Sequence, residues 1–224
     1  MPDFLAFDTS TETLSVAVAR GDAVWWHDAP GGAQASATLI PQILRLLAEA
    51  GLALNRLDAI AFGRGPGSFT GLRTACAVAQ GLGFGAGVPL LPVDSLYALA
   101  QDAHERYGAA RVLALLDARM DQVYTASYAF DGSTDDHTPR LQAPEEVVAP
   151  PGFALAGNAF VAYGERLPAG TARHDALPAA RALLKLAPRL LESGFAVAPQ
   201  DAMPLYIRDK VAQTTAERAL AKSL

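Results

Sequence analysis

Short apolar runs separated by turns begin the chain and predict β-strands. Residues 4–8 form a continuous apolar run that ends in Asp8, whereas residues 13–19 alternate between larger apolar and smaller or polar side chains. A Gly21-Asp22 turn leads into residues 23–27. Runs of this length, bounded by glycine, aspartate and hydroxyl-bearing residues, are typical of strands joined by tight turns. The pattern predicts three antiparallel strands, the first of which ends in a carboxylate.

Two predicted helices, residues 34–50 and 72–86, carry more apolar surface than one sheet can cover. The first has a narrow polar stripe, and its remaining surface is filled by apolar residues, namely Leu39, Ile40, Ile43, Leu44, Leu46, Leu47 and Ala50. The second presents a face of small side chains that includes Val78, Gly81 and Gly85. An interior glycine costs a helix about 1 kcal/mol relative to alanine, so close backbone packing is the expected compensation. Either both helices are buried within a layered fold, or they also meet another chain.

The second helix is preceded by a glycine-rich loop, GRGPGSFTGLR, at residues 63–73. A strand that leads into a glycine-rich loop and a helix N-terminus is a common anion-binding arrangement. This loop, however, lacks the Lys-Ser or Lys-Thr of a phosphate-binding loop, and it does not fit the G-x-G-x-x-G spacing of dinucleotide-binding proteins. We therefore favour a tight strand-to-helix turn capped by Ser68 or Thr70 over a phosphate site.

The strand pattern of the N-terminal part recurs in the second half. Residues 112–117 repeat an apolar strand that ends in Asp117, and residues 122–130 repeat the second strand. Aligning Asp8 with Asp117 matches both strands and the turn without a gap, which indicates an internal duplication. The sequence also predicts an edge strand at 89–93, helices at 95–107, 159–167 and 179–193, the last interrupted by Pro188, and a late strand or extended arm at 202–208. Two α/β lobes with mixed sheets follow from this order, at residues 1–107 and, smaller, at residues 108–224.

Composition narrows the function classes. With 224 residues, 51% hydrophobic and 18% charged, the chain has ample material for a core. The net charge of −5, without a basic run, argues against independent binding to nucleic acid or to acidic membranes. The single cysteine, Cys76, excludes an intrachain disulfide. Because neither a signal peptide nor a membrane-spanning run is recognisable, we expect a cytoplasmic protein.

Segments along nearly the whole chain resemble the TsaB family, also called the YeaZ or glycoprotease-like family, of bacterial partner proteins in threonylcarbamoyl-adenosine synthesis on tRNA. They are residues 4–10, the GRGPGSFTGLR loop, Ala79-Gln80-Gly81-Leu82, Asp94-Ser95-Leu96, Asp117-Ala118-Arg119, Ala156-Gly157-Asn158 and Pro204-Leu205-Tyr206-Ile207-Arg208. The loop is the most specific of these segments. The resemblance implies an α/β fold of the actin-like ATPase (ASKHA) class, built from two ribonuclease-H-like lobes of which the second is reduced.

The resemblance also implies a role without chemistry of its own. Proteins of this family pair with the catalytic subunit TsaD, which transfers a threonylcarbamoyl group from threonylcarbamoyl-adenylate to the adenosine beside the anticodon, and the TsaE ATPase joins them. The two broad helices would bind TsaD or, as a homodimer, a second copy of the chain. The interface residues so implied are Leu39, Ile43, Leu46, Leu47, Arg73, Ala77, Val78 and Gly81, and we expect Arg73 to reach across. Contact with tRNA would be indirect, and any ATP would bind at the joint with the partners, because no cofactor is implied for this chain alone.

Metal-dependent chemistry finds little support in the sequence. Related catalytic subunits bind a metal through a His-x-x-x-His pair on the first-lobe helix, which contains no histidine here. The four histidines, His27, His104, His137 and His174, have no ligand spacing to one another. A peptidase or a metal-assisted transferase is therefore disfavoured.

Nucleotide binding is the remaining chemical hypothesis. In actin-like ATPases, the turns after the first strand of each lobe hold phosphate and help to hold Mg²⁺, and here Asp8, Thr9, Ser10 and Asp117 occupy those places. No glycine accompanies them, so we interpret the site as vestigial, with both aspartates holding turns. The alternative is a small autonomous kinase or ATPase of the same fold.

Overall fold

Two five-stranded mixed sheets frame the molecule, which the computed structural model describes over residues 2–32 and 35–208. The first sheet contains β1 (Phe4–Asp8), β2 (Thr13–Arg20), β3 (Ala23–Pro30), β4 (Ala59–Gly65) and β5 (Leu90–Asp94), in the order β3-β2-β1-β4-β5. Strands β1 to β3 are antiparallel, whereas β1, β4 and β5 are parallel to one another. The C-terminal ends of β1, β4 and β5 therefore lie at the same end of the sheet, and Asp8 is the last residue of β1 at that end.

The second sheet repeats this topology. Its strands are β6 (Arg111–Arg119), β7 (Gln122–Ala129), β8 (Arg140–Gln142), β9 (Ala154–Gly157) and β10 (Arg173–Asp175), and their order is β8-β7-β6-β9-β10. β6 is antiparallel to β7 and parallel to β9, as β1 is to β2 and β4. The order confirms the predicted duplication and the fold class of two ribonuclease-H-like lobes. The second lobe is the reduced one, since β8 and β10 have only three residues each.

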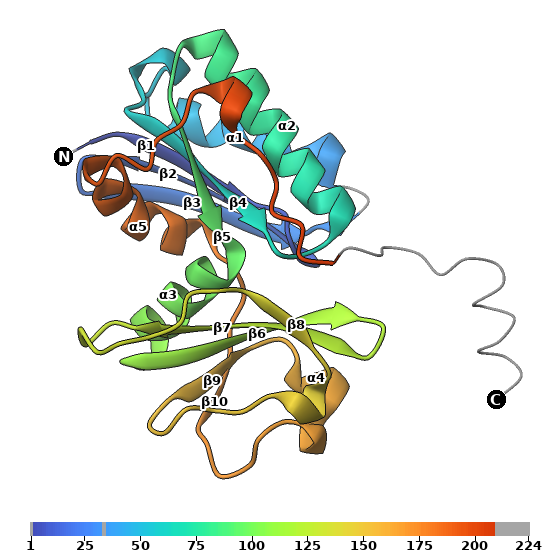
Figure 1. Cartoon of the computed structure of the whole chain (residues 1–224). Helices are drawn as coiled ribbons and strands as arrows, with labels where there is room; N and C mark the ends of the chain where they lie inside the picture. Colours follow the sequence, from blue (N-terminus) through green and yellow to red (C-terminus); the bar gives the residue numbers. More distant parts are fainter. Residues whose placement is uncertain (1, 33–34, 209–224) are drawn as a thin grey trace, which may run out of the picture.

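Helices cover the sheets in three layers (Figure 1). α1 (Ala35–Glu49) and α2 (Phe69–Ala86) lie on the outer face of the first sheet, and α4 (Phe160–Tyr163) lies on the outer face of the second. Between the two sheets are α3 (Ser95–Tyr107) and α5 (Ala180–Glu192). Short 3-10 turns complete the secondary structure at η2 (Leu54–Arg56), η3 (Pro144–Glu146), η4 (Gly164–Arg166) and η5 (Pro199–Asp201).

Each of the two middle helices packs on the sheet formed by the other half of the chain. α3, which follows the first sheet in sequence, packs on β6 and β7 of the second sheet, and α5 packs on β1, β2 and β4 of the first. The packing therefore crosses the boundary expected between residues 107 and 108. Each sheet obtains the cover of its inner face from a helix that belongs to the other half of the chain.

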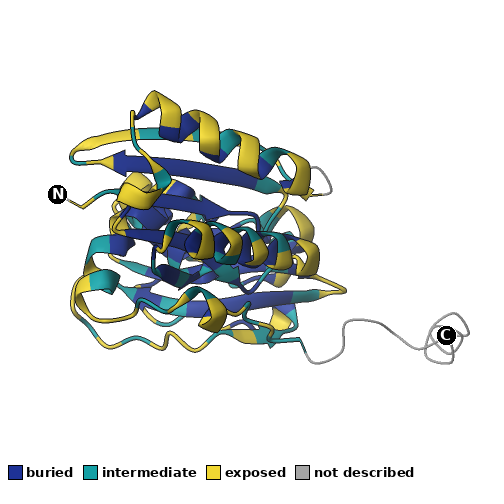
Figure 2. Ribbon diagram, turned by 90° about the horizontal axis from the view of Figure 1, so that it is seen from above, coloured by how far each residue is buried: buried dark blue, intermediate teal, exposed yellow. Residues whose placement is uncertain are grey.

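Strand alternation divides the first sheet between its two helical layers. Leu5 and Phe7 point to α1 and α2, whereas Phe4 and Ala6 point to α5, and all four are buried. Burying a side chain such as that of Phe7 stabilises the fold by roughly 1.5–3 kcal/mol. The strands are accordingly buried between helices whose outward sides remain exposed (Figure 2).

α5 differs from its prediction because it continues through Pro188 to Glu192. Proline removes one backbone hydrogen bond from a helix. Leu183, Leu186 and Ala187 are buried against the first sheet just before the proline, and Leu190 and Leu191 pack partly on the same core beyond it. This packing holds both sides of the proline on one axis.

The predicted late strand is an extended arm that is not part of either sheet. Residues 202–208 run over α2, where Gln80 Nε2 donates to the Ala202 carbonyl at 3.0 Å, and then pass the end of β4, where Leu205 N–H donates to the Arg64 carbonyl at 2.7 Å. The predicted edge strand is confirmed, because β5 is the last strand of its sheet. Gln34, at the start of the first predicted helix, and residues 209–224 of the predicted second lobe lie outside the described residues. Within the described ranges, no helix is long and apolar enough to cross a membrane.

We expect Gly81→Ala to stabilise the isolated chain by about 1 kcal/mol, because alanine is the better helix former. A Cβ atom at Gly81 would have no neighbour within 4 Å, so no clash opposes the gain. Gly83→Ala is the matched control, since its Cβ would lie 2.9 Å from Leu90 Cδ2. Urea unfolding of both variants measures the change in unfolding free energy. Equal changes for Gly81→Ala and Gly83→Ala would contradict the free space around Gly81.

Candidate functional site

The turn after β1 is closed around a buried carboxylate. Asp8 Oδ1 accepts hydrogen bonds from Ser10 N–H at 2.7 Å and from Ser10 Oγ at 2.6 Å, and Asp8 Oδ2 accepts one from Ser95 Oγ at 3.2 Å. Asp8 is fully buried, and this burial raises its pKa to about 6 despite the three donors. The Ser95 hydroxyl, at the start of α3, thus donates its hydrogen bond to Asp8.

The glycine-rich loop lies directly on this turn. Ser68 N–H donates to the Ser10 carbonyl at 2.7 Å, and Thr9 Oγ1 donates to the Gly71 carbonyl at 2.7 Å. A Cβ atom on Gly71 would lie 1.8 Å from the Thr9 carbonyl oxygen, and one on Gly63 would lie 1.7 Å from Asp8 Oδ2. Side chains cannot be accommodated at such distances, so Gly71 allows close contact with the backbone of the turn and Gly63 leaves room for the Asp8 carboxylate.

The start of α2 follows from this contact. Ser68 is the N-cap residue, and its hydroxyl accepts from Gly71 N–H at 3.5 Å, which confirms one of the two predicted caps. Helix α2 begins at Phe69, three residues earlier than the apolar periodicity alone predicts. The loop is therefore a packed joint between β1, β4 and α2.

The corresponding turn of the second lobe is held by Asp117. Its Oδ1 accepts hydrogen bonds from Arg119 N–H at 2.7 Å and from the Tyr163 hydroxyl at 2.9 Å, and its Oδ2 pairs with the Arg119 guanidinium at 2.8 Å. Arg119, Met120 and Asp121 all have positive φ angles, near 50–60°. Three consecutive left-handed residues need local hydrogen bonds to hold them. The geometry agrees with the structural, turn-holding role that we predicted for Asp117.

A cleft of about 690 Å³ separates the two lobes beside these turns. Asn158 bridges it, accepting from Asp117 N–H at 2.9 Å and donating to the Glu12 carboxylate at 3.3 Å. The cleft's ionic lining is mostly acidic, with Glu12, Asp28, Asp102, Asp117 and Asp175 against Arg106, Arg119 and Arg181. Two of these arginines already bind a lining carboxylate, because Arg106 pairs with Asp102 at 2.9 Å and Arg119 pairs with Asp117. An anionic ligand would meet net repulsion here.

The histidines lie apart and mostly against aromatic rings. His104 stacks on Phe130 and His174 stacks on Tyr107. His137 stacks on an aromatic ring as well and pairs with Asp135 at 2.7 Å. Across residues 2–32 and 35–208, no group of three or more His, Cys, Asp or Glu side chains is placed to hold a metal ion.

Four of the predicted interface residues are wrong, because they belong to the core. Leu39, Ile43, Leu46 and Leu47 are at most 4% exposed and pack against the first sheet beneath α1. The large apolar residues of this helix that are exposed are instead Ile40 and Leu44. The helix carries apolar residues on two sides. The side with four large aliphatic residues packs on the sheet, and the other side remains exposed.

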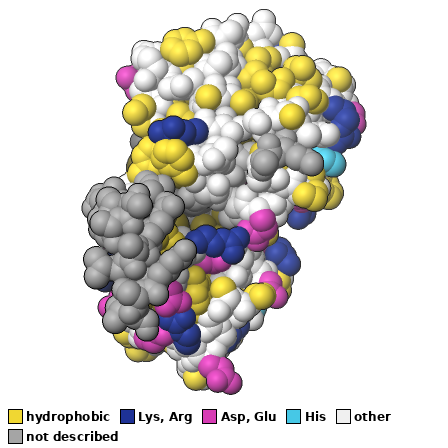
Figure 3. Space-filling view, turned by 90° about the vertical axis from the view of Figure 1, so that its right-hand side faces the viewer, with side chains coloured by type: hydrophobic (Ala, Val, Ile, Leu, Met, Phe, Trp, Pro, Cys, Tyr) yellow, Lys and Arg dark blue, Asp and Glu magenta, His cyan; other side chains and the backbone are white. Residues whose placement is uncertain are grey.

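The outer face of α1 and α2 nevertheless presents several large exposed apolar side chains, and we call it the α1/α2 face. Its large exposed side chains are Ile40 at 42%, Leu44 at 55% and Phe84 at 61%. Of the predicted interface residues on α2, Ala77 and Gly81 are exposed, whereas Val78 is half-buried and packs against the core. Figure 3 shows hydrophobic side chains gathered on this face of the upper lobe.

Arg73 is also exposed, but it binds within the chain. Its guanidinium lies 3.9 Å from the centroid of the Phe69 ring, and its Nε donates to the Tyr206 hydroxyl at 3.1 Å. Tyr206 belongs to the C-terminal arm, which continues to Arg208, and there Arg208 Nη2 donates to Gln122 Oε1 of the second lobe at 2.8 Å. The arm thus links the α1/α2 face to the second lobe, a connection with Arg73 that no sequence pattern predicts.

Two lobes of this topology, with a cleft between their first-strand turns, define a protein of the actin-like ATPase class. A family model described as "TsaD: tRNA N6-adenosine threonylcarbamoyltransferase" matches residues 27–164, more than half of the chain. Relatives named "tRNA threonylcarbamoyladenosine biosynthesis protein TsaB" are 37% identical in Haemophilus influenzae, over 92% of this chain and 94% of the relative, and 36% identical in Escherichia coli K12, over 93% and 95%. The structure titled "YeaZ from Pseudomonas aeruginosa" has a TM-score of 0.86 and 40% identity over 92% of this chain and 100% of that one. The chain belongs to the TsaB (YeaZ) family, as the resemblance predicted.

Asp8→Asn is expected to change how stability depends on pH. Because burial raises the pKa of Asp8 from 3.8 to about 6, its contribution to stability is fully present below pH 3.8 and is lost as the pH rises through 6. The unfolding free energy of the variant, relative to the natural chain, should therefore rise by about 2 kcal/mol between pH 4.5 and 7.5. Urea unfolding at both pH values measures this, with Asp201→Asn as an exposed control. A difference that does not change with pH would contradict the buried, protonatable state of Asp8.

Proposed function

We propose that this protein is a non-catalytic, cytoplasmic subunit of the complex that makes threonylcarbamoyladenosine on tRNA, and that its α1/α2 face binds a TsaD-like catalytic subunit. The observation that carries the proposal is an apolar helix face left exposed next to helix-interior glycines. Membership of the TsaB family supports the pathway, because relatives are named for this biosynthesis. A TsaE-like ATPase would join the pair, and tRNA would be contacted through the complex.

The glycines favour a helical partner. Cβ atoms at Gly81 and Gly85 would meet nothing within 4 Å, so neither glycine is needed for packing inside this chain. Each nevertheless costs α2 about 1 kcal/mol relative to alanine. Glycines on an exposed helix face allow another helix to approach closely, which would compensate for that cost in a complex. Ile40 and Leu44 lie on the neighbouring helix and would fill the flanks of such a contact.

The hydrogen bonds of the Asp8 turn support the absence of catalysis. Backbone and hydroxyl groups occupy both oxygens of Asp8, and the glycine-rich loop lies against the backbone of Thr9 and Ser10. A phosphate-binding turn needs free backbone N–H groups that a ligand can approach. Ser10 N–H is already donated to Asp8, so this turn offers little to a nucleotide.

Arg73 would change partners on binding. Its stacking on Phe69 and its bond to Tyr206 hold the guanidinium at the end of the α1/α2 face. Exposed contacts of this kind contribute little to stability. A carboxylate on the partner could replace Tyr206, and Arg73 would then cross the interface as we predicted.

Leu44→Glu is expected to weaken the complex with the TsaD-like subunit of the same organism by at least about tenfold, because it places a charge in an apolar contact. The isolated variant should keep its unfolding free energy, since Leu44 is 55% exposed. Titration calorimetry with the purified subunit measures the affinity. Ile43→Glu, one residue away but fully buried, is the contrasting variant and should destabilise the fold itself. Unchanged affinity for Leu44→Glu would rule out this face.

The alternative function, an autonomous ATPase, is favoured by the cleft that brings the Asp8 and Asp117 turns to the same side of the molecule. We expect calorimetry with ATP and Mg²⁺ to show no saturable binding up to about 1 mM for the isolated chain. The acidic lining and the paired arginines are the physical reason. Saturable binding that Asp117→Asn abolishes, together with ATP turnover, would establish the alternative and overturn the non-catalytic proposal.

A further inference from the structure

The inner face of the first sheet is only partly covered. Five strands at about 4.8 Å spacing span about 19 Å, whereas a helix is about 10–12 Å wide. Two helices, α1 and α2, cover the outer face. On the inner face, α5 packs on β1, β2, β4 and β5, and α3 reaches β4 and β5, which leaves β3 with little helical cover. The side chains of β3 that point to the α5 side are left open, with Val24 at 40% and Trp26 at 51% exposed.

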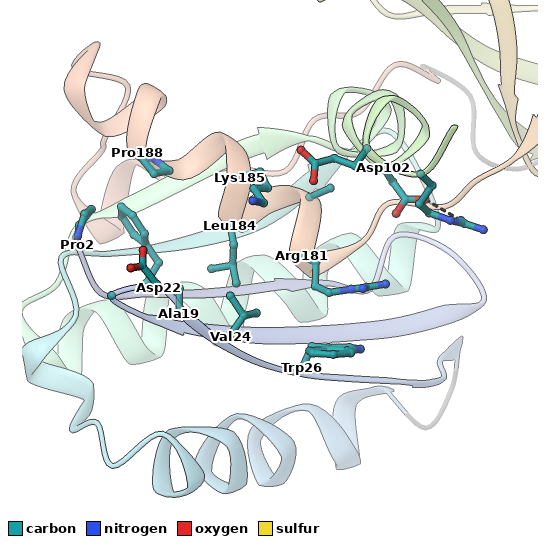
Figure 4. A pocket seen from close by; sticks show the side chains of 15 residues that line it. Pro2, Ala19, Asp22, Val24, Trp26, Asp102, Arg181, Leu184, Lys185 and Pro188 are labelled. Atoms are coloured by element: carbon teal, nitrogen blue, oxygen red, sulfur yellow. Dashed lines mark hydrogen bonds and ion pairs between the residues drawn. The ribbon is translucent and has the colours of Figure 1, made fainter. Parts of the chain in front are cut away.

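These side chains form one wall of a groove of about 470 Å³ between β3 and α5 (Figure 4). Leu184 points from α5 toward Val24, and Arg181 extends over Trp26, with its guanidinium carbon 4.9 Å from the ring centroid. The floor of the groove is apolar. The wall formed by α5 carries two cations, Arg181 and Lys185. We call this feature the β3/α5 groove.

The groove is lined by charges of both signs, namely Asp22, Asp102 and Glu105 together with Arg106, Arg181 and Lys185. In the part of the chain that the structure describes, neither Arg181 nor Lys185 forms a salt bridge. Asp102 is engaged by Arg106 at 2.9 Å, and Glu105 accepts a hydrogen bond from Gln101 at 3.0 Å. Arg181 and Lys185 are therefore the lining cations that can bind carboxylates, whereas Asp22 would repel a carboxylate placed beside it.

β3 is also an open sheet edge. At the other edge of the same sheet, the backbone of β5 is paired, because Leu90 and Val197 exchange two hydrogen bonds at 2.8 and 3.0 Å. Edge strands are usually protected by charge, proline or short length. β3 has eight residues, and its Asp28 and Pro30 come at one end, so Ala23–Trp26 has no such protection. An unprotected edge can accept one more strand from a partner.

The spacing of the cations fits an extended segment. Arg181 and Lys185 are four residues apart on α5, a rise of about 6 Å. Alternate side chains of a β-strand, which share one face, are about 6.6 Å apart. Two carboxylates at positions i and i+2 of an added strand would therefore meet the two cations one to one, and a flanking apolar side chain would rest on Val24 and Trp26.

We propose that the β3/α5 groove binds an extended acidic segment of a second partner protein, which adds to the free edge of β3 and pairs its carboxylates with Arg181 and Lys185. The groove lies on the face of the sheet opposite to α1 and α2. A protein bound there leaves the α1/α2 face free, so the chain would hold two partners at once. This proposal does not depend on the identity of the partner at the α1/α2 face.

The test uses the full chain and a labelled synthetic peptide, Thr-Phe-Thr-Glu-Thr-Glu-Thr-Val, whose two glutamates are at positions i and i+2, with a control peptide that has lysine in place of glutamate. Fluorescence anisotropy should show saturable binding of the acidic peptide, and the basic peptide should bind at least about tenfold more weakly. Amide hydrogen exchange of Ala23–Trp26 should slow with the acidic peptide, which reports strand addition.

Variants separate this site from others. Arg181→Glu and, independently, Lys185→Glu should each weaken the acidic peptide about tenfold, whereas Arg56→Glu, a charge reversal at an exposed arginine outside the groove, should not. Leu44→Glu should bind the peptide normally, because it alters the α1/α2 face. Three results would overturn the proposal: no saturation up to about 1 mM, equal binding of both peptides, or binding that survives both groove variants without slowed exchange in β3.

Discussion

The glycine-rich loop lies backbone against backbone on the turn after β1, and this contact determines the geometry of everything on the outer face of the first sheet. At Gly63 and Gly71 a Cβ atom would come within 2 Å of Asp8 or Thr9. The contact fixes Ser68 as the N-cap and Phe69 as the first residue of α2. The direction of α2, and with it the position of the α1/α2 face, follows from a joint that admits only glycine. The loop resembles a phosphate-binding loop in composition, but its glycines contact the turn after β1 and not a ligand.

The sequence was sufficient for the antiparallel strands that begin each lobe, because alternation and turn residues are local properties, whereas the short strand β10 was not predicted. The Asp8 and Asp117 repeats likewise predicted two lobes of one topology, and the sheet order confirms it. The exposed side of α1 could not be predicted. Its apolar residues occupy two sides, and only the position of the sheet decides that Ile43 is buried and Leu44 exposed. The exchange of α3 and α5 between lobes was equally hidden, since it depends on contacts between residues far apart in sequence.

The exchange of helices makes the lobes mutually dependent. The inner layer consists of α3 and α5, which contact each other and each cover the sheet of the other half. The arm adds a second connection, from Leu205 on Arg64 in the first lobe to Arg208 on Gln122 in the second. Asn158 bridges the interlobe cleft, and the arm connects the lobes at another place, so the two lobes are held together in two places besides the inner layer.

The two faces of the first sheet present different surfaces for one geometrical reason. α1 and α2 cover the outer face, so their outward sides are what a partner would meet there. On the inner face, α5 and α3 lie over β1, β2, β4 and β5, and the edge strand β3 remains bare beside them. A helical face favours helix packing, which needs small residues such as Gly81 for close approach. A strand edge favours backbone pairing, whose specificity comes from flanking charges such as Arg181. The placement of the helices on each side of the sheet thus decides which kind of partner each side can bind.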